Sequence, residues 1–315
     1  MADSIMPALD AIIDPRQKGF IRGRRGEDNI SELTDMFYNN LNKHKQHYFL
    51  FIDTAKAFDS LDHDYLFAVL EKIGMPSWVT NIIRGLMTDV RVCPLLKGRI
   101  RITIPINRGV KQGCPLSPLL FVIAYDPFLS KAGSLPGATV WSYADDAVLA
   151  HNSLDGIEAF TKLIDTFSQI SGFGVNREKC NILHVLDTTT HENDRLKTFP
   201  WANPITGKSL TFTNKAIYLG ILVGYNISTV DIYQEAFDKF EKRADTFSCA
   251  LRFLPTHARI SIFNIHITPL FSYITRFYIL PYKELGNKIR NIMRRKIISF
   301  NGSAHKFIHL CTPPT

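Results

Sequence analysis

The sequence predicts an α+β domain followed by a basic, mostly helical region. Short apolar runs typical of strands alternate irregularly with amphipathic stretches of helical period, and this order favours an α+β architecture. Hydrophobic residues make up 45% of the chain and charged residues 21%, which is ordinary for a globular protein and argues against disorder. Residues 239–315 hold 13 Lys and Arg against 3 Asp and Glu, whereas residues 1–238 hold 24 against 26. Such a basic region suits a polyanion such as nucleic acid, although a solvated helical surface would also explain the charge.

The first third of the sequence indicates three helices and one buried strand. Residues 28–44 carry apolar side chains close to helical spacing, and residues 61–73 and 78–87 do the same. Between them, the run YFLFID at 48–53 is apolar and aromatic, which is typical of a buried strand. This strand ends on Asp53, so a carboxylate is expected at a strand end beside apolar walls.

The middle of the sequence indicates two hairpins separated by a helix. The β-like runs 90–96 and 100–106 flank a Lys-Gly pair suited to a hairpin turn. Residues 119–129 form an apolar stretch that predicts a helix. Residues 138–151 then place two adjacent acids between two apolar runs, which predicts a hairpin with a charged tip.

The last part of the sequence changes from mixed to helical patterning. Residues 156–170 are amphipathic and predict a helix, and the run 218–224 predicts a short strand. From residue 231 onward the pattern is mostly helical and basic. We therefore expect a mixed domain over residues 1–225 and a helical one over residues 226–315.

Three acids form the candidate site. Asp53 ends an apolar strand, where a buried carboxylate is costly without a cation. Asp145 and Asp146 repel one another at a turn, which also favours a bound metal. Joining nucleotides by in-line phosphoryl transfer requires such a set, because two magnesium ions held by a few carboxylates activate the attacking hydroxyl and neutralise phosphate charge. Each acid also has a simpler interpretation as a helix cap, a turn former or a solvated side chain.

Six short motifs occur along the chain: QKGFIRGR (17–24), FIDTAKAFD (51–59), RGVKQGCPLSPLLF (108–121), YADD (143–146), GFGVNREKC (172–180) and YLGILVG (218–224). In this order they resemble the core motifs of reverse transcriptases, most closely the type encoded by non-LTR (LINE-like) retrotransposons. The resemblance covers residues 15–225. It implies a right-hand polymerase-like α+β fold, with a palm, partial fingers and a helical thumb in the basic region.

The resemblance implies an RNA-directed DNA polymerase that adds a dNTP to the 3′-hydroxyl of a DNA primer on an RNA template. Its cofactor would be two Mg²⁺ ions, with Mn²⁺ as the alternative. Asp53 and Asp145 would be the principal metal ligands and Asp146 the weaker third. Phe58 falls on the position of the family's steric gate, where a bulky ring would clash with a ribose 2′-hydroxyl. A core phenylalanine is the alternative interpretation.

The resemblance also implies contacts with the incoming nucleotide. Gln112 and Gly113 match the loop that lies along the nucleotide and the template base, and glycine lets the backbone approach closely. Lys179 stands where the family carries a general acid for pyrophosphate, although a solvated lysine would look the same. Arg24 is the expected triphosphate contact, as a fixed cation with several donors. Its close rivals are Lys18, Arg22 and Arg25.

The primer and the duplex are expected to bind further along the chain. Tyr218, Leu219 and Gly220 match the family's primer grip. The basic region would grip the duplex backbone without reading sequence, through counterion release. Its expected contacts are Lys288, Arg290, Arg294, Arg295 and Lys296. Asp59 also matches a motif, and we expect it to be structural, as a cap for the helix that begins near Leu61.

Three alternatives remain open beside this reading. The sequence begins about fifteen residues before the first motif, where family members usually carry an earlier finger segment, so an inactive remnant that only binds nucleic acid is one of them. An RNA-dependent RNA polymerase would carry Asp at the position of Phe58. A maturase-type reverse transcriptase would need a different C-terminal domain.

Composition bears on metals and location. The five cysteines are scattered and form no CxxC pair, which argues against a zinc ribbon and favours a reducing compartment. His305, His309 and Cys311 lie close together but lack a fourth ligand. Because neither a secretory signal nor an apolar run long enough to cross a bilayer is present, we expect no membrane partner and an intracellular location, nuclear if the chain is active.

Overall fold

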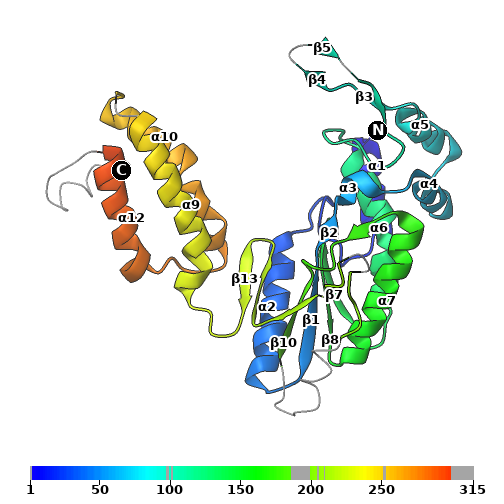
Figure 1. Cartoon of the computed structure of the whole chain (residues 1–315), viewed down its shortest axis with the longest axis horizontal. Helices are drawn as coiled ribbons and strands as arrows, with labels where there is room; N and C mark the ends of the chain where they lie inside the picture. Colours follow the sequence, from blue (N-terminus) through cyan, green and yellow to red (C-terminus); the bar gives the residue numbers. More distant parts are fainter. Residues whose placement is uncertain are drawn as a thin grey trace. The chain divides into compact units, whose positions relative to one another are not determined.

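The computed structural model describes residues 2–96, 99–100, 102–185, 199–203, 206–208, 210–250 and 253–298. It divides into two compact units, Met1–Leu219 and Gly220–Thr315 (Figure 1). The division expected from the sequence, after residue 225, lies a few residues further along the chain. Among the described residues, none of the helices is long and apolar enough to cross a membrane.

A five-stranded sheet forms the centre of the first unit, in the order β11-β10-β1-β8-β7 (Figure 1). Its strands are β1 (His47–Ile52), β7 (Thr139–Tyr143), β8 (Asp146–His151), β10 (Asn181–Val185) and β11 (Thr211–Thr213). β1 lies between β8 and β10 and runs antiparallel to both, whereas β10 and β11 are parallel. The sheet therefore places the strand that precedes Asp53 at its centre.

The described residues of this unit also form the helices α1 (Ala2–Ile12), α2 (Gly26–Asn42), α3 (Ala57–Ser60), α4 (His63–Lys72), α5 (Ser77–Met87), α6 (Ser117–Gly133) and α7 (Leu154–Ser171). On one face, Phe37 of α2 packs on Phe49 of β1, with ring centroids 5.8 Å apart. On the other face, Tyr48 and Leu50 join the main apolar core together with side chains of α6 and α7. Because both faces of β1 are covered, residues 48–52 are all buried, which explains their continuous apolar run.

Short strands complete the first unit: β2 (Thr54–Ala55) with β9 (Gly174–Val175), β3 (Arg91–Val92) with β6 (Ile104–Pro105), β4 (Leu95–Leu96) with β5 (Arg99–Ile100), and β12 (Lys215–Tyr218). The hairpin expected over residues 90–106 is present as the β3–β6 and β4–β5 pairs. Its tip, residues 97–98, lies outside the described residues.

Local sequence signals set the ends of α7. Ser153 caps its start, because its hydroxyl oxygen accepts a hydrogen bond from the Gly156 N–H at 3.2 Å. Gly172 ends it with a φ of 78°, which glycine adopts without steric cost. A Cβ at this position would also lie 2.6 Å from the carbonyl oxygen of Ser60. Glycine is thus required where α7 passes into the segment that supports Asp53.

The second unit is mainly helical. It contains β13 (Ile221–Gly224), α9 (Thr229–Ala250), α10 (Thr256–His266), α11 (Pro269–Ser272), η1 (Ile274–Arg276), η2 (Tyr282–Gly286), α12 (Asn287–Ile292) and η3 (Met293–Ile298). Its core is aromatic: the ring of Phe240 lies 5.8 Å from that of Phe263 and 5.3 Å from that of Phe271, between centroids. The helical pattern expected from residue 231 onward is confirmed for the described residues.

Three sequence-based expectations about local structure are wrong or incomplete. Residues 218–224 are two strands rather than one, because Leu219 and Gly220 have positive φ angles of 47° and 78° and interrupt the extended backbone. Asp59 does not cap α4. That role belongs to Asp62, whose carboxylate accepts hydrogen bonds from the backbone of residues 64 and 65. Helix α1 was not expected at all.

Candidate functional site

Two of the predicted acids face each other across neighbouring strands. β1 and β8 pair with Ile52 opposite Ala147. Because the strands are antiparallel, the residue after Ile52 continues this register opposite the residue before Ala147. Asp53 and Asp146 therefore lie across from one another at the same end of the sheet.

The third acid occupies the adjoining turn. β7 and β8 pair as far as Tyr143 opposite Asp146, which leaves Ala144 and Asp145 as a two-residue turn. Ala144 has a φ of 56°, in the left-handed region that side-chain-bearing residues rarely adopt. The hairpin with an acidic tip that the sequence predicted is present, and its acids lie beside the end of β1.

Electrostatic interaction links the three carboxylates. Burial by the surrounding chain, together with the charges of Asp145 and Asp53, raises the pKa of Asp146 to about 6. The Asp146 side chain still has exposed surface, so water can reach it. The Thr54 hydroxyl donates a hydrogen bond of 3.0 Å to Asp145 Oδ2, which orients that carboxylate. Like charges held this closely favour a bound cation.

The backbone of Asp53 is held by the segment 172–180. Its carbonyl oxygen accepts a hydrogen bond of 2.9 Å from the Asn176 N–H, and its own N–H points at Cys180 Sγ at 3.4 Å. The neighbouring Thr54 pairs with Val175 in the β2–β9 ladder. This motif therefore positions one of the acids, a role that sequence reasoning did not assign to it.

The donor set fits magnesium. All three side chains offer carboxylate oxygens, the ligand type that this hard cation prefers. Among the described residues, no three His, Cys, Asp or Glu side chains form a group that could hold a metal ion by themselves. Magnesium commonly binds one or two carboxylates and completes its shell with water and substrate phosphates. The site matches that pattern better than a closed protein cage.

The expected steric gate lies in an aromatic cluster. The ring of Phe58 stacks on Phe121 of α6 with centroids 4.4 Å apart, and meets the edge of Phe20 at 6.1 Å. Its carbonyl oxygen accepts a hydrogen bond of 2.7 Å from the Val110 N–H. This bond joins Phe58 to the start of the loop that precedes α6. Its side chain is only partly buried, so selection at the sugar stays a prediction.

The loop before α6 is fixed at its start and exposed at its tip. Gly109 has a φ of 79°, and a Cβ there would lie 2.6 Å from the backbone of Asp59, so glycine is required. Gln112 and Gly113 are exposed. Gly113 has a φ of 83° and open space around its Cα, which leaves the tip accessible to a substrate. Their contact with the nucleotide stays a prediction.

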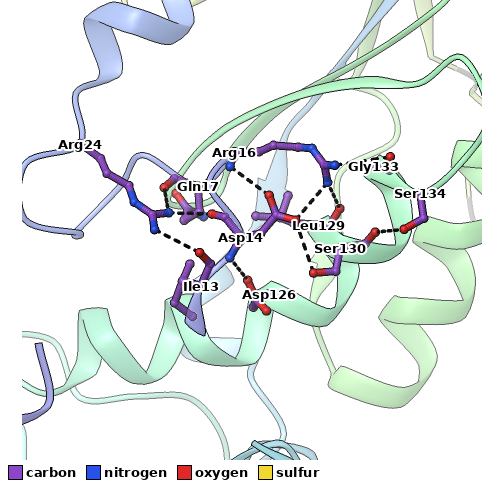
Figure 2. Close-up of polar contacts among 10 residues, drawn as sticks. All are labelled: Ile13, Asp14, Arg16, Gln17, Arg24, Asp126, Leu129, Ser130, Gly133 and Ser134. Carbon is purple, nitrogen blue, oxygen red and sulfur yellow. Dashed lines mark hydrogen bonds and ion pairs between the residues drawn. The ribbon is translucent and has the colours of Figure 1, made fainter. Parts of the chain in front are cut away.

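Arg24 is engaged within the protein (Figure 2). Its guanidinium donates to Asp10 Oδ1 at 3.0 and 3.1 Å. It also donates to the carbonyl oxygens of Asp14 and Gln17 at 2.7 and 2.9 Å, as Figure 2 shows. Further bonds of 3.0 and 3.1 Å reach the carbonyls of Asp10 and Ile13, and the side chain is 12% exposed. Arg24 therefore secures the end of α1. Its contact with a triphosphate stays a prediction, and it would require some of these bonds to break.

A cavity of about 790 Å³ lies beside the acidic hairpin. Its lining includes Tyr143 together with Lys18, Arg22 and Arg24. Within the described part of the chain, no hydrogen bond or ion pair holds the side chain of Lys18 or Arg22. These two cations, which are two of the three rivals of Arg24, line this cavity without a partner for their charged groups among the described residues.

The remaining predicted contacts are spread over both units. Lys179 is exposed, and Tyr218 is buried with its ring 6.4 Å from that of Phe51. Leu219 and Gly220 form the turn after β12. In the second unit the five expected basic contacts lie in α12 and η3, and four have partners in the protein. Lys296 pairs with Asp245, Arg290 lies over the ring of Tyr282, Lys288 lies over the ring of Phe237, and Arg294 is also engaged. None of these roles is tested by the geometry.

Sequence reasoning missed Gln17, which is fully buried and contacts the acidic turn directly. Its side-chain oxygen accepts a hydrogen bond of 2.7 Å from the Ala144 N–H, and its side-chain nitrogen donates to the Ala144 carbonyl oxygen at 3.1 Å. Gln17 belongs to the first quoted motif, but no local pattern distinguishes a buried glutamine from an exposed one.

Known proteins with similar sequences are retrotransposon polyproteins. Residues 1–223 match the family described as reverse transcriptase (RNA-dependent DNA polymerase). The chain is 31% identical over 198 residues to the Pol polyprotein of element R2 from Nasonia vitripennis, covering 59% of this chain and 19% of that protein. It is 32% identical over 179 residues to the one of R2DM from Drosophila melanogaster, covering 53% and 16%. For R2 of Popillia japonica the identity is 29% over 236 residues, covering 69% and 32%. The chain thus spans a third or less of each of these relatives.

Solved structures with a similar fold include telomerases. Apo telomerase from Candida tropicalis aligns with a TM-score of 0.53 at 13% identity, over 98% of this chain and 53% of that one. The telomerase of the same organism in complex with a fragment of telomeric RNA aligns with a TM-score of 0.51 at 14% identity, over 98% and 49%. At this identity the likeness establishes the fold alone. Because the family match covers well over half of the chain and includes the three acids at this end of the sheet, the chain belongs to the reverse transcriptase family, in the type encoded by non-LTR retrotransposons.

Proposed function

We propose that this chain extends a DNA primer along an RNA template by adding dNTPs to the primer 3′-hydroxyl. The observation that carries the proposal is the placement of Asp53 and Asp146 across from one another, with Asp145 in the adjoining turn. In a chain of this family, that arrangement supports nucleotidyl transfer at the end of β1 and β8 where these acids lie. We attribute the activity, substrates and partners named for the relatives to this chain only within this proposal.

Each acid has a distinct part in the proposed site. Asp53 and Asp145 would hold two divalent cations, and Thr54 would keep the Asp145 carboxylate oriented through its hydrogen bond. Two Mg²⁺ ions, when bound, would supply charge neutralisation on the transferred phosphate and activation of the 3′-hydroxyl. Asp146, with a pKa of about 6, is mostly ionised at neutral pH and would add a third negative charge. Mn²⁺, with a similar preference for oxygen ligands, is the alternative cation.

The substrate would occupy the space around this end of the sheet. Lys18 and Arg22, which line the cavity beside Tyr143, would be the cations that meet the triphosphate. Phe58 would exclude a ribose 2′-hydroxyl, and the exposed tip at Gln112 and Gly113 would lie along the base. The expected roles of Lys179, of the primer grip and of the basic helices complete this proposal.

Primer extension on a primed RNA template tests the proposal. We expect Mg²⁺-dependent extension with dNTPs by the folded wild type, much less with rNTPs, and a loss to background in Asp145→Asn, which removes a ligand charge. Asp64→Asn, an exposed acid in α4, is the matched control and should retain extension. Equal extension by Asp145→Asn and the wild type would overturn the assignment of the site.

A second outcome would favour a different class of protein. If the folded wild type binds an RNA–DNA duplex in a salt-dependent way, gives no extension, and binds equally after alanine replaces Asp53 and Asp145, the chain is a nucleic-acid-binding module that has lost turnover. In that case the basic region would carry the function through counterion release.

A further inference from the structure

The turn that presents Asp145 is in a conformation that its own sequence does not favour. Ala144 has a φ of 56°, a conformation in which a Cβ crowds the backbone and which glycine adopts without this steric cost. A two-residue turn with a non-glycine residue in this region costs free energy, and it persists only where the surroundings fix it. The groups that hold Ala144 therefore set the direction in which the next side chain, Asp145, leaves the backbone.

One buried side chain, that of Gln17, forms hydrogen bonds with both the N–H and the carbonyl oxygen of Ala144. The Ala144 N–H donates to Gln17 Oε1 at 2.7 Å, and Gln17 Nε2 donates to the Ala144 carbonyl oxygen at 3.1 Å. The same Nε2 donates to Ser142 Oγ at 3.0 Å. A carboxamide is the side chain suited to this task, because it offers an acceptor and two donors in one plane. It replaces the strand partner that the turn residue lacks.

Gln17 is itself held in place from several sides. The Gly19 N–H donates to Gln17 Oε1 at 2.8 Å, and Arg24 donates to the Gln17 carbonyl oxygen at 2.9 Å (Figure 2). The backbone of residues 16–18 bonds with Ser142 on both sides, with distances of 3.2 and 2.8 Å. A Cβ at Gly19 would lie 2.2 Å from the Ala144 nitrogen, so glycine permits this close approach. The pair of hydrogen bonds between Gln17 and Ala144, called the clamp below, is therefore fixed both at Gln17 and at the turn.

The side chain of Gln17 is 0% exposed, which excludes direct contact with a substrate or a metal. All of its contacts with the site pass through the backbone of the turn. We propose that Gln17 is a positioning residue, which fixes the Ala144 turn and so aims the Asp145 carboxylate at the divalent cations that it would hold together with Asp53. This inference rests on the proposed function of the acids as metal ligands, and it extends that function to a residue that touches neither metal nor nucleotide.

Mn²⁺ binding by the full chain tests the proposal without requiring polymerisation. Free Mn²⁺ would be measured by electron paramagnetic resonance during titration of the wild type, Gln17→Leu and Asp145→Asn. Leucine keeps similar volume and removes both hydrogen bonds to Ala144. We expect Gln17→Leu to weaken Mn²⁺ binding about tenfold, the effect typical of lost partners that orient metal ligands. Asp145→Asn should abolish the same binding.

Two further variants separate positioning from loss of stability. Asn29→Leu is the matched control, because Asn29 is also a buried amide and bonds Ser142, but it bonds the strand carbonyl at 2.9 Å and not the turn. It should lower the melting temperature about as much as Gln17→Leu while changing Mn²⁺ affinity less than about twofold. Gln17→Leu combined with Ala144→Gly should regain part of the affinity, since glycine adopts the left-handed φ without the clamp.

The outcomes distinguish this inference from the proposed function. Absence of primer extension by the wild type would refute the function alone, because the titration still reports whether Gln17 orients the acids. Equal Mn²⁺ affinity in the wild type and Gln17→Leu would overturn the positioning role. So would loss of affinity in Asn29→Leu to the same extent, failure of Ala144→Gly to restore any binding, or Mn²⁺ binding that Asp145→Asn leaves unchanged.

Discussion

At the scale of single residues, a second pair of acids shows how this chain manages buried charge. The Asp14 N–H donates to Asp126 Oδ1 at 2.7 Å, and the Asp14 carboxylate accepts bonds from the Arg16 backbone and guanidinium at 2.9 and 3.0 Å (Figure 2). Ser130 Oγ adds a longer contact of 3.4 Å to the same carboxylate. This network joins the end of α1 to α6, next to the segment that contains Gln17. It explains why Asp14, Arg16 and Arg24 serve structure here.

The pKa of Asp126 leads to a prediction about stability and pH. Burial raises this pKa, and the Asp14 charge also raises it. The hydrogen bond from the Asp14 N–H and the charge of Arg24 lower it by less, so the pKa is raised overall. A carboxyl whose pKa is higher in the folded state stabilises the fold when protonated, and this contribution is lost as pH rises through the folded pKa. Asp126→Asn, neutral at all pH values and still an acceptor for Asp14, should therefore melt higher than the wild type at pH 7.

The difference in melting temperature between Asp126→Asn and the wild type should shrink as pH falls toward 3.8, the ordinary pKa of aspartate. Melting temperatures between pH 4 and pH 8 measure it. Asp35→Asn, an exposed acid of α2, is the control and should show a smaller change. A variant that melts lower than the wild type by a constant amount across this range would contradict the prediction.

Sugar selection gives a second prediction at this scale. Shortening the ring in Phe58→Val should raise the use of rNTPs relative to dNTPs by about tenfold or more in kcat/KM, because a smaller side chain no longer excludes the 2′-hydroxyl. The same change removes stacking on Phe121 and should cost about 1–3 kcal/mol of stability. Phe128→Val, buried in the same aromatic cluster, should lose stability without changing the ratio. An unchanged ratio in Phe58→Val would show that Phe58 is only a core residue.

At the scale of elements, one hydrogen-bonding acid decides where α4 begins. Asp62 has an extended backbone (φ −71°, ψ 132°), and its Oδ1 accepts from the N–H groups of Asp64 and Tyr65 at 3.0 and 3.2 Å. Asp59 instead lies within the short helix α3, with its N–H bonded to the Lys56 carbonyl oxygen. The cap expected at Asp59 is therefore displaced, because the chain makes one extra turn after Phe58 before α4 starts.

This difference can be measured by denaturation. Asp62→Ala should lower the free energy of unfolding by about 1 kcal/mol, the usual cost of a lost N-cap. Asp59→Ala, the paired variant, should cost less because no backbone donor depends on its side chain in the described structure. If urea denaturation gives the larger loss for Asp59→Ala, the assignment of the cap is wrong.

At the scale of the whole molecule, basic charge is concentrated in the helical unit but is not equally free there. Lys288 and Arg295 are exposed, whereas Lys296 pairs with Asp245. Lys288 also lies over the ring of Phe237, with its nitrogen 5.8 Å from the centroid, which orients the side chain without neutralising it. These differences rank the five predicted contacts by how readily each could meet a phosphate.

Duplex binding should follow this ranking. Replacing Lys288 and Arg295 by glutamine should weaken binding of an RNA–DNA duplex and reduce the slope of log K against log salt by about two, because each phosphate contact contributes about one. Lys162→Gln with Lys208→Gln removes the same charge from the first unit and should leave the slope nearly unchanged. A fluorescence anisotropy titration at several salt concentrations measures both, and equal slopes in all three proteins would contradict a thumb-like role.

The sequence by itself determined the elements of the site. The apolar run before Asp53, the acidic hairpin of Asp145 and Asp146, and the helical basic region all follow from local periodicity and composition, and each is present in the structure. The family was also readable from the order of the motifs. These features are local, since hydrophobic spacing and turn residues act over a few neighbours in the chain.

Only the tertiary structure decided how these elements cooperate. The register that brings Asp53 opposite Asp146 depends on pairing between strands far apart in sequence. The same holds for Gln17, whose bonds to Ala144 span 127 residues, and for the bonds by which Arg24 secures the end of α1. Side-chain hydrogen bonds of this kind leave no periodic signal, because a polar residue looks the same in sequence whether it faces water, a substrate or a buried backbone group.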